Sequence, residues 1–583
     1  MNQRTKTGLE ILQAAGLIGI LGNLLLRQSP WGLNAFLFVT VFVAGLLMLM
    51  WRRRPELLTK NTIALAGAMM FFASMFLIRD SEQLLVFDTL AILVIMGVML
   101  LVNLDIKAHV AGTFHYVAGF VWSGLTSAFG SFVLLGSDID WKEMPGNKIS
   151  KSVFAVLRGI AIALPLLLIF GALFMAADAA FEGIVNRAFN FDADVAVSHV
   201  MVTSVLAWLT AGYFRGAIAE KFVPRAAAVV NVATEKSGKD ETASFVDKVT
   251  AEPADNSASL PDNATILEHI NRSDPPNTTQ AEPAKKSDWQ NFDNSVLPAG
   301  FTLGTVETVI ILGLIDLLFL AFVIMQVPYL FGGMDLIQQT PDFKLADYAR
   351  RGFGELVAVA ALVLPMLLAS HWLLRREGGK TETIFKALAG VQIGLLFVIM
   401  ASAVQRLVLL TGELGYGMTH IRFYPMVFMI WLAVVFGWFA LTVFRGARNH
   451  FAWGALWSAI VILGATNLMN PDAFIVRTNV DLMQKGRAFD SFYNTSASDD
   501  AVPTLLDSLH SMDAYDACIT RMNLRNRLIR SLDEQDLRSW NLSRSTAQSM
   551  IAQENSVVEE TAIGYNGCTH LQNYSDANGN LTP

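Results

Sequence analysis

Apolar segments of about 20 residues recur along most of the chain, and they limit the fold more than any other feature. A helix that crosses the hydrocarbon core of a bilayer needs about that many predominantly apolar residues. The composition agrees, because 53% of the residues are hydrophobic and only 16% are charged, whereas soluble domains are about 25% charged. The sequence therefore predicts an all-α polytopic membrane helix bundle with about eleven spans. The segments that suit a span are 9–26, 31–50, 61–78, 84–102, 153–175, 196–214, 303–328, 353–374, 383–410, 423–443 and 451–469.

Positive charge predicts the orientation of these spans, because cytoplasmic loops retain an excess of Lys and Arg. The turns "WRRRPELLTK" (51–60) and "RREGGKTETIFK" (375–386) are rich in positive charge and are expected inside. The loops "RDSEQ" (79–83) and "TGELGYGMTH" (411–420) are poor in it and are expected outside. This pattern places the N-terminus inside, in the cytoplasm, and the C-terminus outside.

One further apolar segment, "HVAGTFHYVAGFVWSGLTSAFGSFVLLG" (109–136), is long enough to cross but is rich in Gly, Ser and Thr. The charge assignments agree with one another only if residues 103–152 begin and end on the inside. We therefore expect a re-entrant or interfacial hairpin here, and a true crossing is the alternative.

Composition divides the chain into four parts. Residues 1–225 and 301–469 form two membrane halves, and 226–300 are rich in Asp, Glu, Pro, Ser, Asn and Thr. Such a segment buries too little apolar surface to fold, so a disordered cytoplasmic linker is predicted. Residues 470–583 are polar and carry apolar residues at helical spacing, which predicts a small external, periplasmic helical domain. The net charge of −7 argues against nucleic acid as a partner.

Catalytic motifs are mostly missing from the sequence. "GGKT" (378–381) resembles the end of a phosphate-binding loop, but Leu374 stands where the first glycine of that loop belongs. Neither a zinc-binding His-Glu-x-x-His helix nor a Gly-x-Ser-x-Gly nucleophile turn is present. His109 and His115 are six residues apart and point to different sides of a helix. We expect no metal and no cofactor, and the sequence favours a protein that is not an enzyme.

Ionisable residues inside the spans are the first candidates for function, because each costs roughly 2.5–3.5 kcal/mol at a helix centre. Asp316 lies in the middle of "VETVIILGLIDLLFLAFVIMQ", and Glu307 lies near the inner end of the same segment. Arg158 is a candidate partner for Glu307. Two interpretations of Asp316 stay open: a structural hydrogen bond to another helix, or a relay for protons or cations.

A second group of candidates forms an external mouth before the span at 353–374. Asp347, Arg351 and Glu355 are four residues apart, so they share one face of a helix. Arg406 lies at a depth comparable to Glu355. One interpretation is a ladder of charges that neutralises itself, with Arg351 held in place. The other is a mouth that recognises an anion, whose members are Asp347, Tyr348, Arg350 and Arg351 together with Glu355 and Arg406.

Cys518 and Cys568 are the only cysteines of the chain. Both fall in the segment that the charge pattern places outside, where oxidation is allowed. We therefore predict a disulfide between them, which would contribute roughly 4 kcal/mol in the chain-entropy model. Two unrelated buried thiols are the alternative.

Six motifs occur in order along the second half of the chain: "QVPYLFGG" (326–333), "ADYARRGFGELVAVAAL" (346–362), "QRLVLLTGELGYGMTHIRFY" (405–424), "NPDAFIVRTNVD" (470–481), "SDDAVPTLLDSL" (498–509) and "RSWNLSRSTAQ" (538–548). Together they resemble a family of bacterial multi-pass membrane proteins described as a domain of unknown function (4153/4173). The resemblance covers roughly 300 to 550 and extends to the first half by hydropathy. It implies the membrane architecture and brings no activity or cofactor.

Two functions are therefore compared. The first is a non-catalytic envelope sensor or assembly partner, which lies in the lipid bilayer and binds a protein partner through the C-terminal domain. The alternative is a transporter-like protein that moves a small solute or proton by means of Asp316 and the mouth at 348–355. Few polar residues besides Asp316, Gln326, Gln392 and Gln405 are available to line a path, so the first is favoured. An enzyme that acts on lipids ranks third.

Overall fold

The computed structural model is helical throughout the residues that it describes, and it contains no β-strand within them. Leu303 and Leu374 form an isolated bridge. Eleven of these helices are long and apolar enough to cross a membrane, which confirms the predicted all-α membrane fold. The described residues are 2–27, 29–103, 111–141, 193–218, 303–331, 353–374, 379–411, 417–446, 450–532, 536–557 and 568.

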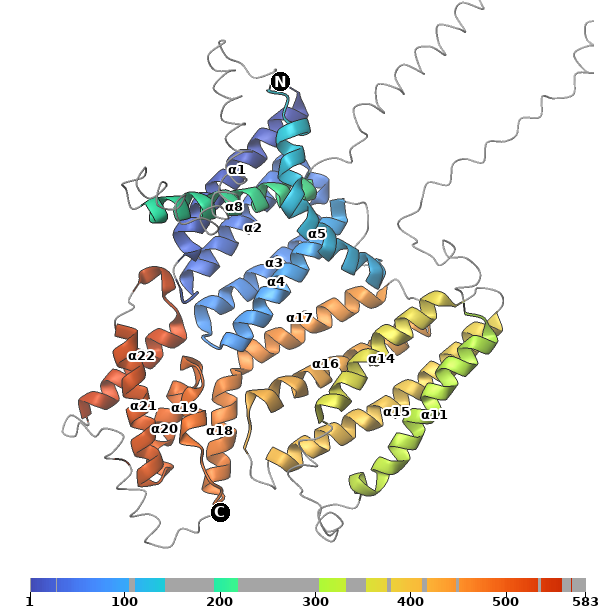
Figure 1. The fold of residues 1–583 in the computed structure, drawn as a ribbon, viewed down its shortest axis with the longest axis vertical. Coiled ribbons are helices and arrows are strands. Elements are labelled where there is room, and N and C mark those ends of the chain that lie inside the picture. Colours follow the sequence, from blue (N-terminus) through green and yellow to red (C-terminus); the bar gives the residue numbers. More distant parts are fainter. Residues whose placement is uncertain are drawn as a thin grey trace, which may run out of the picture. The chain divides into compact units, whose positions relative to one another are not determined.

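Within the described residues, the N-terminal membrane half consists of six helices (Figure 1). Their shared core is made of aliphatic and aromatic side chains such as Leu46, Phe72 and Phe214, which are fully enclosed. Where helices meet, small residues let the backbones approach, as is usual between membrane helices. The helices are α1 (Gln3–Leu26), α2 (Leu33–Arg53), α3 (Lys60–Ile78), α4 (Glu82–Asn103), α5 (Thr113–Val133) and α8 (Ala193–Ile218).

Helices α1 and α8 pack against each other in opposite directions. A Cβ atom at Gly19 of α1 would lie 2.6 Å from the Cβ of Ala207 in α8, so a larger residue would push the helices apart. Four residues further along α1, the Asn23 Nδ2 lies 2.8 Å from the His199 Nδ1, which is earlier in α8. The C-terminal end of α8 therefore lies at the same face of the bundle as the N-terminal end of α1.

The predicted hairpin at 109–136 is wrong, because the residues from Thr113 to Asp138 form one continuous helix. Helix α5 runs without reversal and is extended by a π-helical turn at Leu134–Asp138. Its small residues serve close packing and do not break the helix. A Cβ atom at Gly130 would lie 2.8 Å from the carbonyl oxygen of Gly212 in α8. One at Gly119 would lie 2.8 Å from Leu101 in α4.

Helix α5 contacts the same side of the bundle near its start and near its end. Near its start, Phe120 lies against Gly97 in the last turns of α4. Just beyond its end, Asp138 pairs with Arg215 in the last turn of α8 at 2.7 Å, and the Asp140 N–H donates to Thr5 in α1. The charge pattern places all of these ends inside. The contacts thus favour an interfacial course, although α5 is among the eleven helices that suit a span.

The described part of the C-terminal membrane half consists of five helices. They enclose a second core that includes Leu396, Phe436 and Phe439. Helix α17 also packs Trp453 and Trp457 against the N-terminal core, and so joins the two halves. The helices are α11 (Thr305–Phe331), α14 (Phe353–Leu373), α15 (Gly379–Thr411), α16 (His420–Val443) and α17 (Phe451–Met469). The expected span at 153–175 and the expected linker at 226–300 lie outside the described residues.

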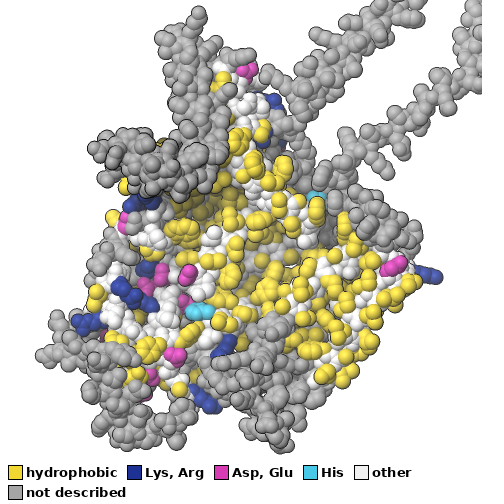
Figure 2. All heavy atoms as spheres, in the orientation of Figure 1, with side chains coloured by type: hydrophobic (Ala, Val, Ile, Leu, Met, Phe, Trp, Pro, Cys, Tyr) yellow, Lys and Arg dark blue, Asp and Glu magenta, His cyan; other side chains and the backbone are white. Residues whose placement is uncertain are grey.

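A C-terminal helical region follows α17 directly and has a core of its own, which includes Val476, Val502 and Leu505. Lys, Arg, Asp and Glu side chains gather over this region, whereas hydrophobic side chains cover the membrane helices (Figure 2). Its elements are α18 (Pro471–Gln484), α19 (Ser491–Ser496), the 3-10 turn η9 (Asp499–Ala501), α20 (Val502–Ser508), α21 (Ala514–Leu532), the 3-10 turn η11 (Leu537–Ser539) and α22 (Leu542–Val557).

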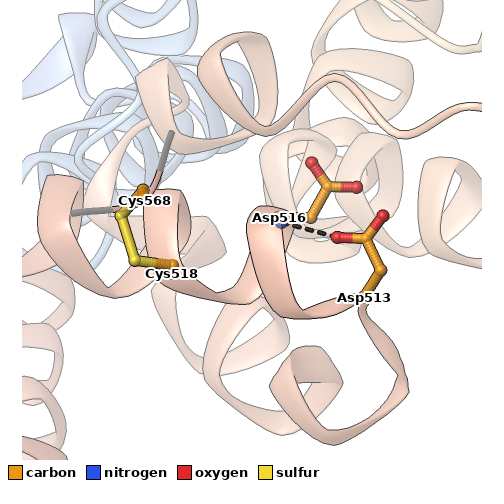
Figure 3. The surroundings of a disulfide bond; sticks show 4 residues. All are labelled: Asp513, Asp516, Cys518 and Cys568. Atoms are coloured by element: carbon orange, nitrogen blue, oxygen red, sulfur yellow. Dashed lines mark hydrogen bonds between the residues drawn. A yellow bond between two sulfur atoms is a disulfide. The ribbon is translucent and has the colours of Figure 1, made fainter. Parts of the chain in front are cut away.

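The predicted disulfide is confirmed. Cys518 in α21 is bonded to Cys568, and their Cα atoms are 5.8 Å apart. Figure 3 shows the bond beside the start of α21, where the Asp513 carboxylate accepts a hydrogen bond from the Asp516 N–H. The bond closes a separation of 50 residues and ties a residue beyond α22 to the middle of the C-terminal region.

Candidate functional site

The C-terminal region is hydrogen-bonded to three turns between membrane helices. The Leu33 N–H, after the α1–α2 turn, donates to the Trp540 carbonyl at 2.8 Å. The Asn541 amide donates to the carbonyl of Phe76 at the end of α3. At the start of α16, the His420 N–H donates to the Tyr493 hydroxyl at 2.9 Å. These three turns therefore share one face of the protein, as the charge pattern predicts for the loops expected outside.

We call the polar contact between this region and these turns the outer junction. Its residues are charged or polar and come from elements far apart in the sequence. They are Arg79, Asp80 and Ser81 of the α3–α4 turn, His420 of α16, and Asp472, Tyr493, Asp499, Asp500, Asn541 and Arg544 of the C-terminal region.

Asp500 caps the beginning of α4. One of its carboxylate oxygens accepts hydrogen bonds from the backbone N–H groups of Asp80 and Ser81, at 3.0 and 3.1 Å. The first N–H groups of a helix have no partner inside that helix and carry the positive end of its dipole. A carboxylate from the C-terminal region satisfies these groups, and Arg79 lies 3.9 Å from its other oxygen. Asp500 therefore connects η9 to a membrane helix.

Asp80 makes the reciprocal contact, from the α3–α4 turn to the C-terminal region. Its carboxylate accepts a hydrogen bond from the Asp499 N–H at 3.4 Å and pairs with Arg544 of α22 at 3.1 Å. Burial raises the pKa of Asp80 to about 7, and the neighbouring charges of Asp499 and Asp500 act in the same direction against Arg544. This carboxyl therefore changes its charge near neutral pH, at the point where the C-terminal region meets α4.

A chain of hydrogen bonds links α16 to α18 and α19. The His420 Nε2 lies 2.9 Å from the Asp472 carboxylate, and the Tyr493 hydroxyl lies 3.1 Å from the His420 Nδ1. Burial favours the neutral form of Asp472, but hydrogen bonds from His420 and Ser498 outweigh it and lower its pKa. Burial raises the pKa of Tyr493. These hydrogen bonds hold the start of α16 against α18 and α19.

The outer junction extends into the adjoining ends of two membrane helices. Asn467 of α17 donates to the Asp88 carboxylate of α4 at 2.8 Å, and both residues are fully buried. Arg79 donates to the Asn467 carbonyl at 2.8 Å. The chain then turns sharply at Asn470, whose φ of 59° is left-handed and whose side chain caps α18 by accepting from the Ala473 N–H.

The residues predicted from the sequence lie elsewhere, and the structure does not bring them together. Asp316 is buried in α11, where neither of its carboxylate oxygens has a partner within the described part of the chain. Glu307 is exposed in the first turn of α11. Glu355 and Arg406 are helical, but their side chains lie outside the described residues, as do Arg158, Asp347, Tyr348, Arg350 and Arg351 entirely. The ladder and the mouth therefore stay predictions.

No group of three or more His, Cys, Asp or Glu residues suited to a metal ion occurs among the described residues. Sequence reasoning missed the outer junction, because each of its acids is an ordinary loop or helix-start residue when considered alone. A signal was nevertheless present. The motifs "NPDAFIVRTNVD", "SDDAVPTLLDSL" and "RSWNLSRSTAQ" contain Asp472, Asp500, Asn541 and Arg544.

The described residues contain helices suited to membrane spans and a helical region docked on the ends of these helices. Such an arrangement is that of a multi-pass membrane protein. No recognisable catalytic centre occurs within the described ranges. The chain matches the family described as "Domain of unknown function (DUF4153)" over residues 64–236 and 269–508. It belongs to that family. The match reaches further into the N-terminal half, and ends earlier, than the range of 300 to 550 expected from the motifs. No curated protein and no solved structure matches the chain.

Proposed function

We propose that this protein is a non-catalytic envelope sensor or assembly partner in the inner membrane of a bacterium. In this proposal, the C-terminal region is a periplasmic domain that binds a protein partner. The outer junction passes the effect of binding to the membrane helices. The observation that carries the proposal is the two-way contact in which Asp500 caps α4 and Asp80 holds η9.

A continuous series of contacts leads from the surface of the C-terminal region to the membrane. Arg527 of α21 donates to the Asp499 carboxylate at 2.9 Å and to the carbonyls of Thr495 and Ala497. Asp499 in turn donates its N–H to Asp80, next to the first turn of α4. A change in the position of α21 would therefore alter the hydrogen bonds at the end of a membrane helix, which is what coupling between two sites requires.

The surface around η11 supports an external location at the edge of a bilayer. Leu537 and Trp540 are 86% and 40% exposed, and Trp31 in the adjacent α1–α2 turn is 43% exposed. Arg538 donates to the Leu24 carbonyl at the end of α1. Tryptophans are enriched at membrane interfaces, where their rings are half apolar. We place this surface at the periplasmic headgroup region.

A photo-crosslinking experiment tests the proposal. A crosslinking amino acid replaces Ile529, which is exposed on α21, and in the control it replaces Leu314, which is exposed on α11. We expect one discrete protein to be crosslinked at position 529 and not at 314, and to be lost when Arg527→Ala breaks the contact with Asp499. Equal, diffuse labelling at both positions would contradict the proposal.

The alternative of a transporter-like protein has one observation in its favour, which is the unpaired carboxylate of Asp316. A reconstituted transporter should move protons or a small solute across vesicles without a partner, whereas a sensor should not.

A further inference from the structure

Two polar side chains are buried between α11 and α15 without a hydrogen-bond partner among the described residues. Asp316 of α11 is 7% exposed and Gln392 of α15 is 0% exposed. Both carboxylate oxygens of Asp316 and both amide atoms of Gln392 are enclosed and unpaired. A polar group in an apolar interior without a hydrogen bond costs roughly 2–7 kcal/mol. Two such groups in adjacent helices therefore have a role other than packing.

The two helices run side by side in the same direction (Figure 1). The hydroxyls of Thr305 and Thr381, near the starts of α11 and α15, lie 2.6 Å apart and fix the register of the pair. Asp316 follows Thr305 by eleven residues, and Gln392 follows Thr381 by the same number. Eleven residues are about three turns, which return a side chain to the same face about 16 Å further along the helix. Helical register therefore places Asp316 and Gln392 at about the same level, on the sides of α11 and α15 that carry Thr305 and Thr381, and no hydrogen bond joins the two side chains in this structure.

Burial along α11 supports this placement. Thr308, Leu312, Asp316 and Val323 are buried and form a single stripe, whereas Leu314 and Leu317 between them are 62% exposed. The described helix that packs extensively along this stripe is α15. On α15 the buried residues recur at helical spacing on both sides of Gln392, among them Phe385, Ala389, Leu396 and Ala403.

We propose that Asp316 and Gln392 form a binding site for one proton in the interior of the membrane. A carboxylate without a cation is very costly in such surroundings, and a bound proton removes its charge. The resulting O–H can donate to the Gln392 carbonyl oxygen, while the Gln392 amide donates to the other carboxyl oxygen. The pair thus satisfies both side chains when the proton is bound and leaves the Gln392 carbonyl without a donor when it is released. This site is separate from the outer junction and goes beyond the proposed sensor function.

Carbodiimide labelling of the full-length protein in native membranes tests the site. Dicyclohexylcarbodiimide enters lipid and reacts with protonated carboxyl groups. We expect an adduct on Asp316 at pH 6 and at least several-fold less at pH 9, measured by mass spectrometry of the Asp316 peptide. Glu307 of the same helix is exposed and serves as the internal control, because a water-soluble carbodiimide should reach Glu307 and spare Asp316.

The Gln392→Leu variant separates a paired site from a lone acid. The leucine variant removes a hydrogen bond from both forms of Asp316, but the bond from an amide to a charged carboxylate is the stronger one, so half-maximal labelling should move to higher pH. Gln392→Asn, whose shorter side chain cannot reach as far, should shift the pH of half-maximal labelling in the same direction. This variant replaces Gln392→Leu if the leucine variant does not fold. Absence of an Asp316 adduct, equal labelling at both pH values, or an unchanged midpoint in the Gln392 variants would overturn the proposal. Protection by sodium at constant pH would also overturn it, in favour of a metal cation.

Discussion

Asp500 and Asp316 are both buried aspartates, one at the outer junction and one between α11 and α15. Asp500 accepts two backbone hydrogen bonds and lies beside Arg79. Asp316 has no partner among the described residues, and the side chain opposite it, Gln392, has none either. The first arrangement makes a carboxylate part of the structure. The second leaves a carboxylate available for binding, because a group that served only stability would be paired.

The two sites also differ in how far apart in the sequence their residues lie. At the outer junction, residues more than 400 positions apart are in contact, as when Asp80 and Ser81 meet Asp500. Between α11 and α15, the two buried polar residues Asp316 and Gln392 belong to one membrane half and are placed by helical register. The long-range contacts at the outer junction hold the C-terminal region to the bundle. The arrangement between α11 and α15 arises wherever two parallel helices carry polar residues at matching positions.

The largest expected effect concerns the side of the membrane on which each turn lies. We expect reporters fused after residue 55, 240 or 380 to behave as cytoplasmic, and those after 415 or 480 to behave as external, because the outer junction joins the turns that carry little positive charge. A reporter after residue 141 should be cytoplasmic if α5 is interfacial. Alkaline phosphatase and fluorescent-protein fusions measure this, and a cytoplasmic signal at 480 would overturn the assignment of the outer junction.

Removal of the disulfide should have the next largest effect. A variant with Cys518→Ala and Cys568→Ala loses a cross-link that closes a separation of 50 residues, which is worth about 4 kcal/mol in the chain-entropy model. Thermal unfolding of the purified protein should show the loss in the C-terminal region. Wild-type protein that has been reduced should match the variant. If the two differ, the cysteines contribute through packing and not through the bond.

A smaller loss is expected for Asn541→Ala. Its side-chain amide donates to the carbonyls of Phe76 and Arg79, at 2.8 and 2.7 Å. Each buried carbonyl left without a donor costs about 1–3 kcal/mol. The melting temperature should fall. Limited proteolysis should begin where the C-terminal region contacts the end of α3. Thr546→Ala, an exposed change in α22 that affects only a contact with Leu542, is the control and should leave the melting temperature unchanged.

The pH dependence of stability should be the smallest of these effects. Burial raises the pKa of Asp80 from 3.8 to about 7. Between these values the folded protein keeps a proton that the unfolded chain has released, so stability should increase as the pH falls from about 7 toward 4. Asp80→Asn should flatten the dependence of the melting temperature on pH in that window. Asp507→Asn, an exposed change in α20, should not, and a steeper curve for Asp80→Asn would show that another group titrates.

Local pattern explains what could be predicted from the sequence. Apolar segments of sufficient length identified the membrane helices, since the bilayer fixes that length. The two cysteines were paired because only one pairing exists. The hairpin at 109–136 was predicted wrongly, because Gly119 and Gly130 have a packing role that depends on neighbours such as Gly212, and single-sequence patterns do not show neighbours.

The outer junction could not be predicted for a related reason. Asp80 and Asp500 become a pair only after the C-terminal region has folded onto the α3–α4 turn, and nothing near either residue indicates the other. Asp316 stood out because an acid in an apolar segment is conspicuous by itself. Gln392 was recognised as polar but not as its partner, because the register between α11 and α15 is set by Thr305 and Thr381.

The most direct test of the contrast is one measurement on two matched variants, Asp500→Ala and Asp316→Ala, in the purified full-length protein. Thermal unfolding should show a loss of roughly 3 kcal/mol for Asp500→Ala, since two backbone N–H groups at the start of α4 lose their acceptor. Asp316→Ala should stay within about 1 kcal/mol of wild type, since neither carboxylate oxygen of Asp316 has a hydrogen-bond partner among the described residues. A stable Asp500→Ala protein beside a strongly destabilised Asp316→Ala protein would contradict the account, because the structural and the available carboxylate would then be reversed.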